Sequence, residues 1–233
     1  MTNKSFPRVR SVTGGTFLMP RHEFVEWVKQ QGRDIHDPDI NDWDICGDTL
    51  VHTAAKQGRI DVMEWCLAIG GNVNADDNLN AYRPLNCAAE NGHLAAMKWL
   101  VEHGADIHWI NKYGTTLMMD VAVGGSVEAL NWLVSMGKEG DVSTGSSDGH
   151  TPMHDAAKHG RLAAVKWLKD HGADINARED NGTPLQLLTV QIKIFQRGLR
   201  KAIKENSSNA WNKSTQLERM KATLQWMKKN GAV

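Results

Sequence analysis

The sequence predicts an all-α solenoid, built from stacked helix-turn-helix units with hairpin-like fingers between them. Six tryptophans recur in short apolar runs, at intervals of 38, 34, 33, 35 and 59 residues. Each run ends at a glycine five residues after its tryptophan, and four of the tryptophans lie sixteen residues after a matching helix start. A near-constant period in the low thirties is typical of stacked helical repeats, in which one unit cannot bury its own apolar faces.

The recurring tryptophans are expected to be core residues. Each occurs at helical spacing on an apolar face, and such residues usually pack between helices. A ladder of ligand-binding aromatic side chains is the alternative interpretation. The six tryptophans are Trp27, Trp65, Trp99, Trp132, Trp167 and Trp226.

Composition indicates an ordinary folded chain. Of 233 residues, 41% are hydrophobic and 23% are charged, and the formal net charge is zero. No apolar run approaches the roughly 18–20 residues that a membrane-spanning helix needs. The cysteines, an odd number without CxxC spacing, fit packing roles in a reducing compartment, so a cytoplasmic location is expected. They are Cys46, Cys66 and Cys87.

The N-terminus is basic. Its first 22 residues contain Lys4, Arg8, Arg10 and Arg21 and no acidic residue. A solvated basic tail over residues 1–19 is expected, and an organellar targeting segment is the alternative.

The helix starts lie in the segments 47–58, 81–92, 114–125 and 149–160, and the last is the most regular. Thr151 is placed to cap the helix, and proline at the next position needs no amide partner. Ala156 and Ala157 are small enough to let a neighbouring helix approach closely. Gly160 is expected to end the helix in a left-handed conformation. A second helix follows over 162–170.

The segment 149–182, HTPMHDAAKHGRLAAVKWLKDHGADINAREDNG, resembles the ankyrin repeat, whose first helix opens with Thr-Pro-Leu-His and continues with two alanines. Matches to this pattern cover about residues 47–188. The resemblance implies that the motif histidine, here His154, forms hydrogen bonds between repeats. The departures are Leu50 in the first repeat, Arg83 in the second, and Met118, Met119 and Asp120 in the third.

The repeat register predicts four parts of the chain. They are the basic tail (1–19), an N-terminal capping half-repeat with a helix at about 21–31 (20–46), four ankyrin repeats (47–182) and a C-terminal capping repeat (183–233). In the last part 43 residues, not sixteen, separate Thr183 from Trp226, which indicates an insertion at about 190–214. Thr215 and Glu218 form a capping-box pattern for the final helix.

The resemblance also implies a function. Ankyrin proteins generally bind partners through the finger tips and the exposed surface of the first helices. The chain is therefore expected to be a non-catalytic protein-binding scaffold, adaptor or subunit of a larger assembly. The implied contacts are Asp77, Tyr82, Trp109, Tyr113, Asp148, Glu179 and Asp180 on the fingers, with Lys158 and His159 on a helix surface.

Two tryptophans stand outside the core register. Trp109 lies in a finger where the family usually has alanine, so an interface anchor is one interpretation and packing on the adjacent finger is the other. Trp211, in the polar stretch NSSNAWNKS, is a second candidate anchor.

The C-terminal insertion is basic. Residues 191–230 contain ten basic residues and two acidic ones, with Ile192, Phe195, Leu199, Ala202 and Ile203 at helical spacing. It is either the solvated outer face of a capping repeat or a site for an acidic partner, nucleic acid or an anionic membrane. The candidate patch comprises Lys193, Arg197, Arg200, Lys201 and Lys204.

Enzyme motifs are absent from the sequence, which has no GxSxG, Walker or HExxH pattern. His150 and His154 have the i, i+4 spacing of a metal pair, but His154 is the motif histidine and His150 precedes the helix cap. We therefore expect no catalytic residue, metal site or cofactor.

Overall fold

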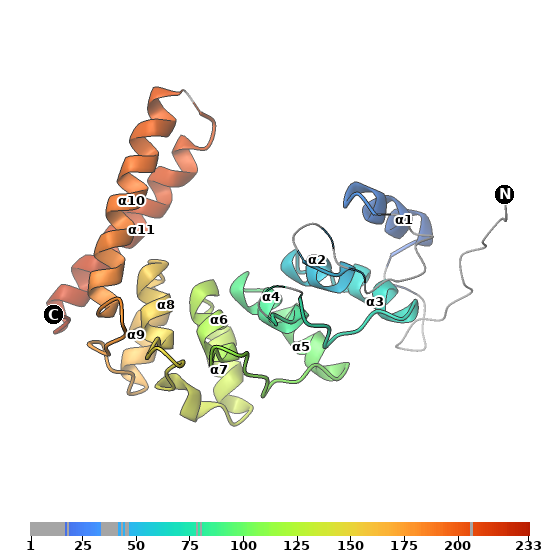
Figure 1. Cartoon of the computed structure of the whole chain (residues 1–233), viewed down its shortest axis with the longest axis horizontal. Helices are drawn as coiled ribbons and strands as arrows, with labels where there is room; N and C mark the ends of the chain where they lie inside the picture. Colours follow the sequence, from blue (N-terminus) through green and yellow to red (C-terminus); the bar gives the residue numbers. More distant parts are fainter. Residues whose placement is uncertain are drawn as a thin grey trace. The chain divides into compact units, whose positions relative to one another are not determined.

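The computed structural model describes residues 17, 19–33, 42, 44, 47–77, 79, 81–205 and 207–233. These residues form eleven α-helices, one 3-10 turn and, as their only strand-like pairing, an isolated bridge between Glu179 and Gly182 (Figure 1). The chain divides into two compact units, Met1–Ile107 and His108–Val233. No helix in the described part is long and apolar enough to cross a membrane.

The first unit contains a single helix, α1 (Arg21–Gln30), followed by two helix pairs. The pairs are α2 (Leu50–Lys56) with α3 (Ile60–Ala68), and α4 (Pro84–Glu90) with α5 (Leu94–Glu102). The first helices of the two pairs pack on each other, as do the second helices.

The start of the first unit packs on the α3 tryptophan. The ring of Phe17 stacks on Trp65 at 3.7 Å, and Trp65 donates its indole N–H to the carbonyl of Met19 at 2.9 Å. The prediction of a solvated tail is therefore wrong for its last described residues, Phe17 and Met19, which pack on the α3 tryptophan. The tail before Phe17 and the predicted packing role of Cys46 lie outside the described residues.

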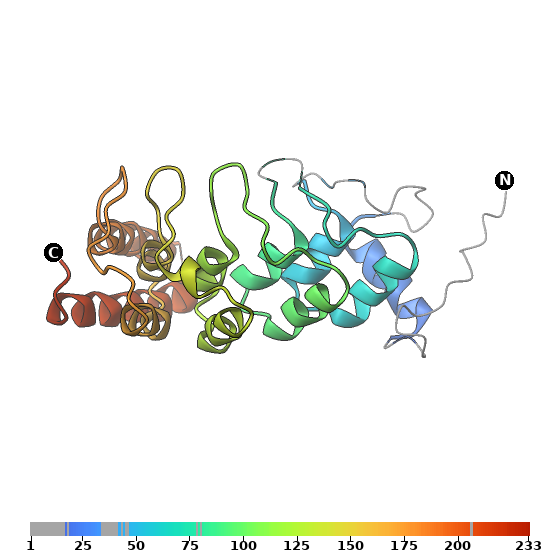
Figure 2. The ribbon, with the colours of Figure 1, turned by 90° about the horizontal axis from the view of Figure 1, so that it is seen from below.

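The second unit contains three helix pairs. They are α6 (Leu117–Gly124) with α7 (Val127–Ser135), α8 (Pro152–Lys158) with α9 (Leu162–Asp170), and α10 (Pro184–Lys204) with α11 (Ala210–Lys229). First helices again stack on first helices and second helices on second helices. A 3-10 turn, Glu139–Val142, follows α7, and the fingers of this unit extend on one side of its helices (Figure 2).

Small residues let the first helices approach. Ala54 and Ala55 in α2 and Ala156 and Ala157 in α8 are completely buried. Gly160, after α8, has φ +65° as predicted, and a Cβ there would lie 2.7 Å from the Met220 side chain. A side chain at this position would therefore strain the backbone and push α11 away from α8.

The motif histidines connect neighbouring repeats, as the family resemblance implies. In α8 the Nδ1 atom of His154 accepts the backbone N–H of Thr151 at 3.1 Å, while Nε2 donates to the carbonyl of Gly182 at 3.3 Å. His52 in α2 does the same with Thr49 at 3.2 Å and with the Tyr82 carbonyl at 2.9 Å. Burial lowers the pKa of both histidines, which keeps them neutral and able to accept at Nδ1.

The third repeat lacks this histidine, and its helix cap lacks a partner. Met119 occupies the position, and the buried hydroxyl of Thr116 has no hydrogen-bond partner within the described residues. The carbonyl of His150 is the counterpart of the Tyr82 and Gly182 carbonyls. It accepts the backbone N–H of Ser146 at 2.8 Å, a bond within the finger that the other two carbonyls also have, so the carbonyl is satisfied although the helix cap is not.

An asparagine joins each of two fingers to the end of the following second helix. Asn74 donates its side-chain amide to the Gly104 carbonyl at 2.8 Å and accepts the N–H of Asp106 at 3.0 Å. Asn176 repeats this arrangement with the Gly231 carbonyl at 2.9 Å and the N–H of Val233 at 2.8 Å. The last repeat is therefore in register with the others at its base.

The recurring tryptophans differ in burial. Trp27, Trp65, Trp99 and Trp167 are buried, whereas Trp132 and Trp226 are half-buried. The ammonium groups of Lys166 and Lys169 lie 5.8 and 5.6 Å from the Trp226 ring, so polar side chains cover part of it.

The predicted insertion lengthens both helices of the last pair. α10 continues unbroken through Gly198 to Lys204, and α11 begins at Ala210. The predicted capping box is wrong, because Thr215 lies inside α11 and donates its hydroxyl to the Trp211 carbonyl at 3.2 Å. The start of α11 therefore precedes this pattern by several residues.

Replacing His52 with methionine, the residue of the third repeat, is expected to lower the free energy of unfolding by about 2–4 kcal/mol. The buried N–H of Thr49 loses its partner, and the Tyr82 carbonyl loses one of its two hydrogen bonds. Urea denaturation followed by circular dichroism measures this. The volume-conserving Met119→Leu breaks no hydrogen bond and should cost under about 1.5 kcal/mol. Equal effects of the two substitutions would contradict the structural role of the histidine.

Trp167→Ala should cost about 3–5 kcal/mol, because it removes a buried ring together with its 2.8 Å hydrogen bond to Asn131. Trp132→Ala should cost clearly less, since that ring is half-buried. Denaturation midpoints of the two variants, measured side by side, test this order.

Candidate partner-binding surface

Hydrogen bonds hold the tip of the finger at residues 108–116 in one conformation. The side-chain carbonyl of Asn111 accepts the N–H of Tyr113 at 2.9 Å and that of Thr115 at 3.0 Å. The next finger also holds it, because Ser147 donates both its N–H and its hydroxyl to the Tyr113 carbonyl at 3.0 Å. The backbone of this finger is therefore fixed before any partner binds.

The same finger presents apolar surface. Ile110 is 50% exposed and Tyr113 is 49% exposed, with the ammonium of Lys112 at 5.0 Å from the Tyr113 ring. Trp109 is half-buried, an exposure that fits neither a fully exposed interface anchor nor a ring fully packed on the adjacent finger. An exposed aliphatic and an exposed aromatic side chain on a rigid backbone form a suitable anchor for a partner protein.

Asp77 and Tyr82 lie together in the finger between α3 and α4, where both are half-buried. Asp77 accepts the N–H of Tyr82 at 3.0 Å, and the Tyr82 hydroxyl donates to Glu90 at 3.1 Å. They line a hollow of about 310 Å³ together with Asp48, Lys56, Cys87 and Glu90. Asp77 and Tyr82 therefore stabilise the finger by their hydrogen bonds and also line a hollow that a partner could contact.

Glu179 is a correction to the predicted contacts. Its side chain is only 4% exposed, and its carboxylate accepts a short hydrogen bond from Nδ1 of His150. Nε2 of His150 donates to Asp155 in α8 at 2.9 Å. Burial by itself would lower the pKa of His150, but the hydrogen bonds and charges of the two carboxylates raise that pKa to about 9. Glu179 therefore joins two fingers and faces inward.

The other predicted contacts remain on the surface to differing degrees. Asp148 is exposed and accepts the Ser146 hydroxyl at 2.5 Å, a bond that holds its pKa below the usual value. Asp180 and Lys158 are exposed, whereas His159 is half-buried with Nδ1 at 3.0 Å from the Asp155 carbonyl.

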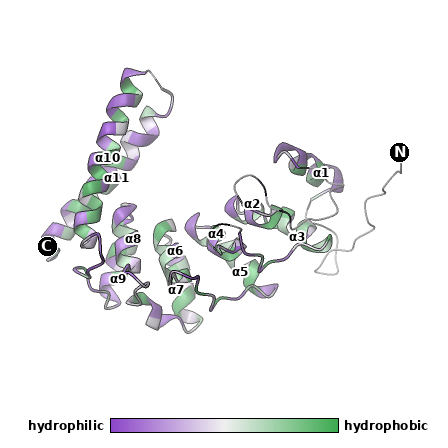
Figure 3. Ribbon diagram, viewed as in Figure 1, coloured by the Kyte–Doolittle hydropathy of each residue, from purple (hydrophilic) through white to green (hydrophobic). Residues whose placement is uncertain are grey.

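The basic patch lies on the projecting part of the α10–α11 hairpin. The residues Lys193, Arg197, Arg200, Lys201 and Lys204 are all exposed on α10. Hydrophilic residues dominate this part of the hairpin, with apolar positions among them (Figure 3). Ile203 corrects the predicted apolar face, because it is largely exposed, as is Trp211 near the start of α11.

His150 and His154, whose spacing resembles that of a metal pair, use all of their ring nitrogens in hydrogen bonds within the protein. No group of three potential metal ligands occurs in the described part of the chain. Cys66 and Cys87 are buried, and burial raises the pKa of the Cys66 thiol to about 12, which suits a packing role.

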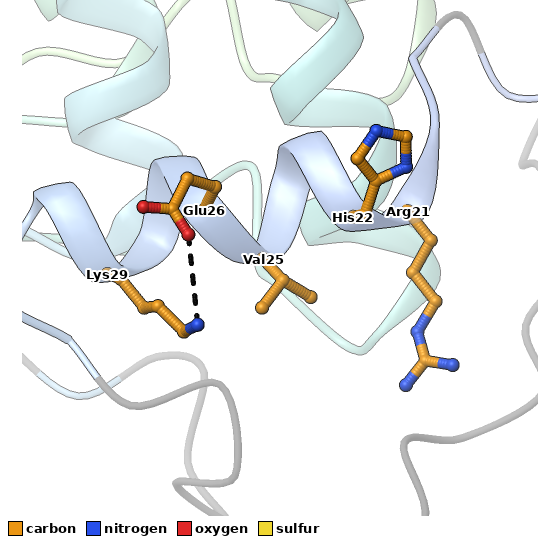
Figure 4. A pocket seen from close by; sticks show the side chains of 5 residues that line it. All are labelled: Arg21, His22, Val25, Glu26 and Lys29. Atoms are coloured by element: carbon orange, nitrogen blue, oxygen red, sulfur yellow. Dashed lines mark ion pairs between the residues drawn. The ribbon is translucent and has the colours of Figure 1, made fainter.

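A larger hollow of about 640 Å³ lies along α1 (Figure 4). Its lining, among the residues that the structure describes, comes from this one helix, and two of these residues, Lys29 and Glu26, form an exposed ion pair at 3.7 Å. Ligand sites usually bring polar groups together from several elements, so this surface is a weak candidate for a small-molecule site.

Sequence reasoning missed several exposed apolar residues, among them Ile110, Val190 and Ile194. The last two alternate with buried Leu188 and Ile192 along α10, so the run looks like one apolar segment in the sequence. The helical period of 3.6 residues distinguishes the exposed pair from the buried pair. Val190 and Ile194 lie one helical turn apart on the face of α10 opposite the core.

Stacked helix pairs with protruding fingers define a class, the helical-repeat solenoids that present extended binding surfaces. The chain belongs to the ankyrin-repeat family, since the family model described as ankyrin repeats (3 copies) matches residues 20–111 and 105–179. Repeats of this family generally mediate protein–protein interaction and are generally non-catalytic.

The chain is similar to repeat-containing proteins of very different kinds. It is 27% identical to alpha-latrocrustotoxin-Lt1a of Latrodectus tredecimguttatus over 189 residues, 81% of this chain and 13% of that protein. It is 34% identical over 108 residues to a transient receptor potential cation channel subfamily A member 1 homolog of Caenorhabditis elegans (45% of this chain, 9% of that protein). Synphilin-1 of Mus musculus is 25% identical over 141 residues (58% and 15%). The chain spans less than a fifth of each relative.

The His150 cluster predicts a pH dependence of stability. Because the folded pKa of His150, about 9, exceeds its ordinary value of 6.5, its contribution is complete below about pH 6.5 and is lost as the pH rises through about 9. The loss should reach at most about 3 kcal/mol. Urea denaturation of the wild type and His150→Gln from pH 6 to 10 measures it.

The difference in stability between wild type and His150→Gln should shrink with rising pH. When the same comparison is made in proteins that also carry Glu179→Gln, the difference should shrink at a lower pH, because one of the two carboxylates that raise the pKa of His150 is removed. A difference that does not change with pH would show that His150 is neutral in the fold.

Proposed function

We propose that the protein is a non-catalytic interaction module, a scaffold, adaptor or subunit of a larger assembly, that captures a partner protein through its fingers and first-helix surface. The observation that carries the proposal is the finger at 108–116. It combines exposed Ile110 and Tyr113 with a backbone held by Asn111 and Ser147.

Rigidity matters for this proposal. A loop that is already ordered loses little conformational entropy on binding, so more of the contact energy contributes to affinity. Aromatic and aliphatic anchors surrounded by polar side chains are typical of interface hot spots. Lys112, Asp148 and Asp180 supply such a polar surrounding on the fingers. Trp109 precedes Ile110 in the same finger and is half-buried, so part of its ring area is also exposed.

The double variant Ile110→Asp, Tyr113→Ala should reduce recovery of the partner at least about tenfold, because two interface anchors are lost. The measurement is quantitative mass spectrometry of proteins that co-purify with the intact chain from its native source. Met136→Ala is the matched control, since Met136 is also exposed and apolar but follows α7 away from the fingers.

Both variants should melt within a few degrees of the wild type, because the changed side chains are exposed. A partner set that is recovered equally with the finger variant and with the Met136 control would overturn the assignment of this finger. Trp109→Ala is interpreted only beside its melting temperature, since that side chain is half-buried.

A further inference from the structure

One line of side chains runs along the exposed face of α10. Val190, Ile194, Arg197 and Lys201 follow the i, i+4, i+7, i+11 spacing that places residues on one side of a helix. Val190 is 54% exposed and Ile194 is 52% exposed, and both cations are exposed as well. The opposite side of α10 is the buried one, with Leu188, Ile192 and Ala202. These four exposed residues are named here the α10 stripe.

The α10 stripe begins on the first-helix surface. Val190 lies seven residues after the capping Thr183, the position that Lys158 has after Thr151 in α8. α8 ends there, whereas α10 continues to Lys204. At 1.5 Å per residue, the part of α10 from Val190 onward extends about 20 Å beyond the length of an ordinary first helix.

The charge along this extension is uncompensated. Within the described residues, Lys193, Arg197, Arg200 and Lys204 form no ion pair. Lys201 pairs with Glu205 at 3.8 Å, but both side chains are more than half exposed, so this pair contributes little. The extension therefore presents apolar surface at its base and positive charge toward its tip.

We infer that the α10 stripe is a docking site for an acidic amphipathic helix of a partner protein. Such a helix would place its apolar side chains over Val190 and Ile194 and its carboxylates beside Arg197 and Lys201. About 14 residues of helix match the length from residue 190 to the end of α10. The inference rests on the proposed function, because it adds a partner contact to the same first-helix surface.

Other occupants fit the stripe less well. Nucleic acid would use stacking surfaces and cations, and it has no use for two exposed aliphatic side chains. A membrane-bound helix carries its cations beside the apolar face, whereas Arg197 and Lys201 lie in line with Val190 and Ile194. A second α10 stripe would bring like charges together.

The probe is a fluorescein-labelled helical peptide of 18 residues, with leucines in one half of a face and glutamates in the other half. Its control is an isomer with the same composition spread around the helix. Fluorescence anisotropy with the intact chain should give at least about tenfold weaker binding of the isomer.

Paired variants locate the site. Arg197→Glu with Lys201→Glu should weaken peptide binding at least about tenfold, whereas Lys228→Glu with Lys229→Glu, the same charge change at the end of α11, should weaken it less than about threefold. Val190→Gln with Ile194→Gln should also weaken it, by about fivefold or more, since glutamine keeps the helix but removes apolar contact.

Equal loss from the two charge-reversal pairs, or no loss from the glutamine pair, would overturn the inference. Tighter binding of an oligouridine RNA 20-mer, or of vesicles with 30% phosphatidylserine, than of the peptide would overturn it in favour of those occupants. Concentration-dependent dimers of the chain that are lost with Arg197→Glu and Lys201→Glu would overturn the inference and identify a second copy of the chain as the occupant.

The peptide result is independent of the finger proposal. Ile110→Asp with Tyr113→Ala should leave peptide binding unchanged, so failure of the finger assignment and failure of the α10 stripe are separately visible.

Discussion

The close stacking of one helix pair on the next is the constraint on which the rest of the structure depends. The first helices α2, α4 and α8 have only seven residues each, too few to be stable in isolation. Their buried alanine pairs bring neighbouring backbones near enough for side chains of one repeat to reach carbonyls of the next. The hydrogen bonds of His52, His154 and Asn176 exist because of that approach.

The third repeat shows that the finger carbonyl can be satisfied without the histidine. Where Met119 replaces the histidine, the backbone N–H of Ser146 donates to the equivalent carbonyl at 2.8 Å from within the same finger. This bond does not serve the helix cap at Thr116, whose hydroxyl remains buried without a partner in the described structure. A finger can thus be stabilised locally where the link between repeats is missing.

The helix pairs could be predicted from the sequence because their signals are local. A helix-start pattern, a tryptophan and a glycine recur at fixed spacing, so the positions of the four regular helix pairs followed from the sequence. The inward position of Glu179 could not be predicted, since it depends on His150 in the adjacent finger. The start of α11 was also missed, because the capping pattern at Thr215 lies inside the helix, and the residue that precedes α11, Asn209, makes no side-chain cap.

Surface exposure was the least predictable property of the candidate sites. Ile110 is an anchor candidate because it is exposed on a finger whose backbone is held by the hydrogen bonds of Asn111. Ile203 was expected on the apolar face of the insertion, but its side chain is largely exposed on α10. Asp180 and Lys158 are exposed, as a finger and a helix surface would suggest.

The Asn176 contacts with Gly231 and Val233 show that the last repeat closes normally at its base although its helices are far longer than the others. Residues added at the far end of the hairpin therefore leave the stack undisturbed. Such an outgrowth can change in length, charge or tip sequence over evolutionary time without a cost in folding. The recognition that we infer for the hairpin and the stability of the array are in this sense separable traits, open to independent selection.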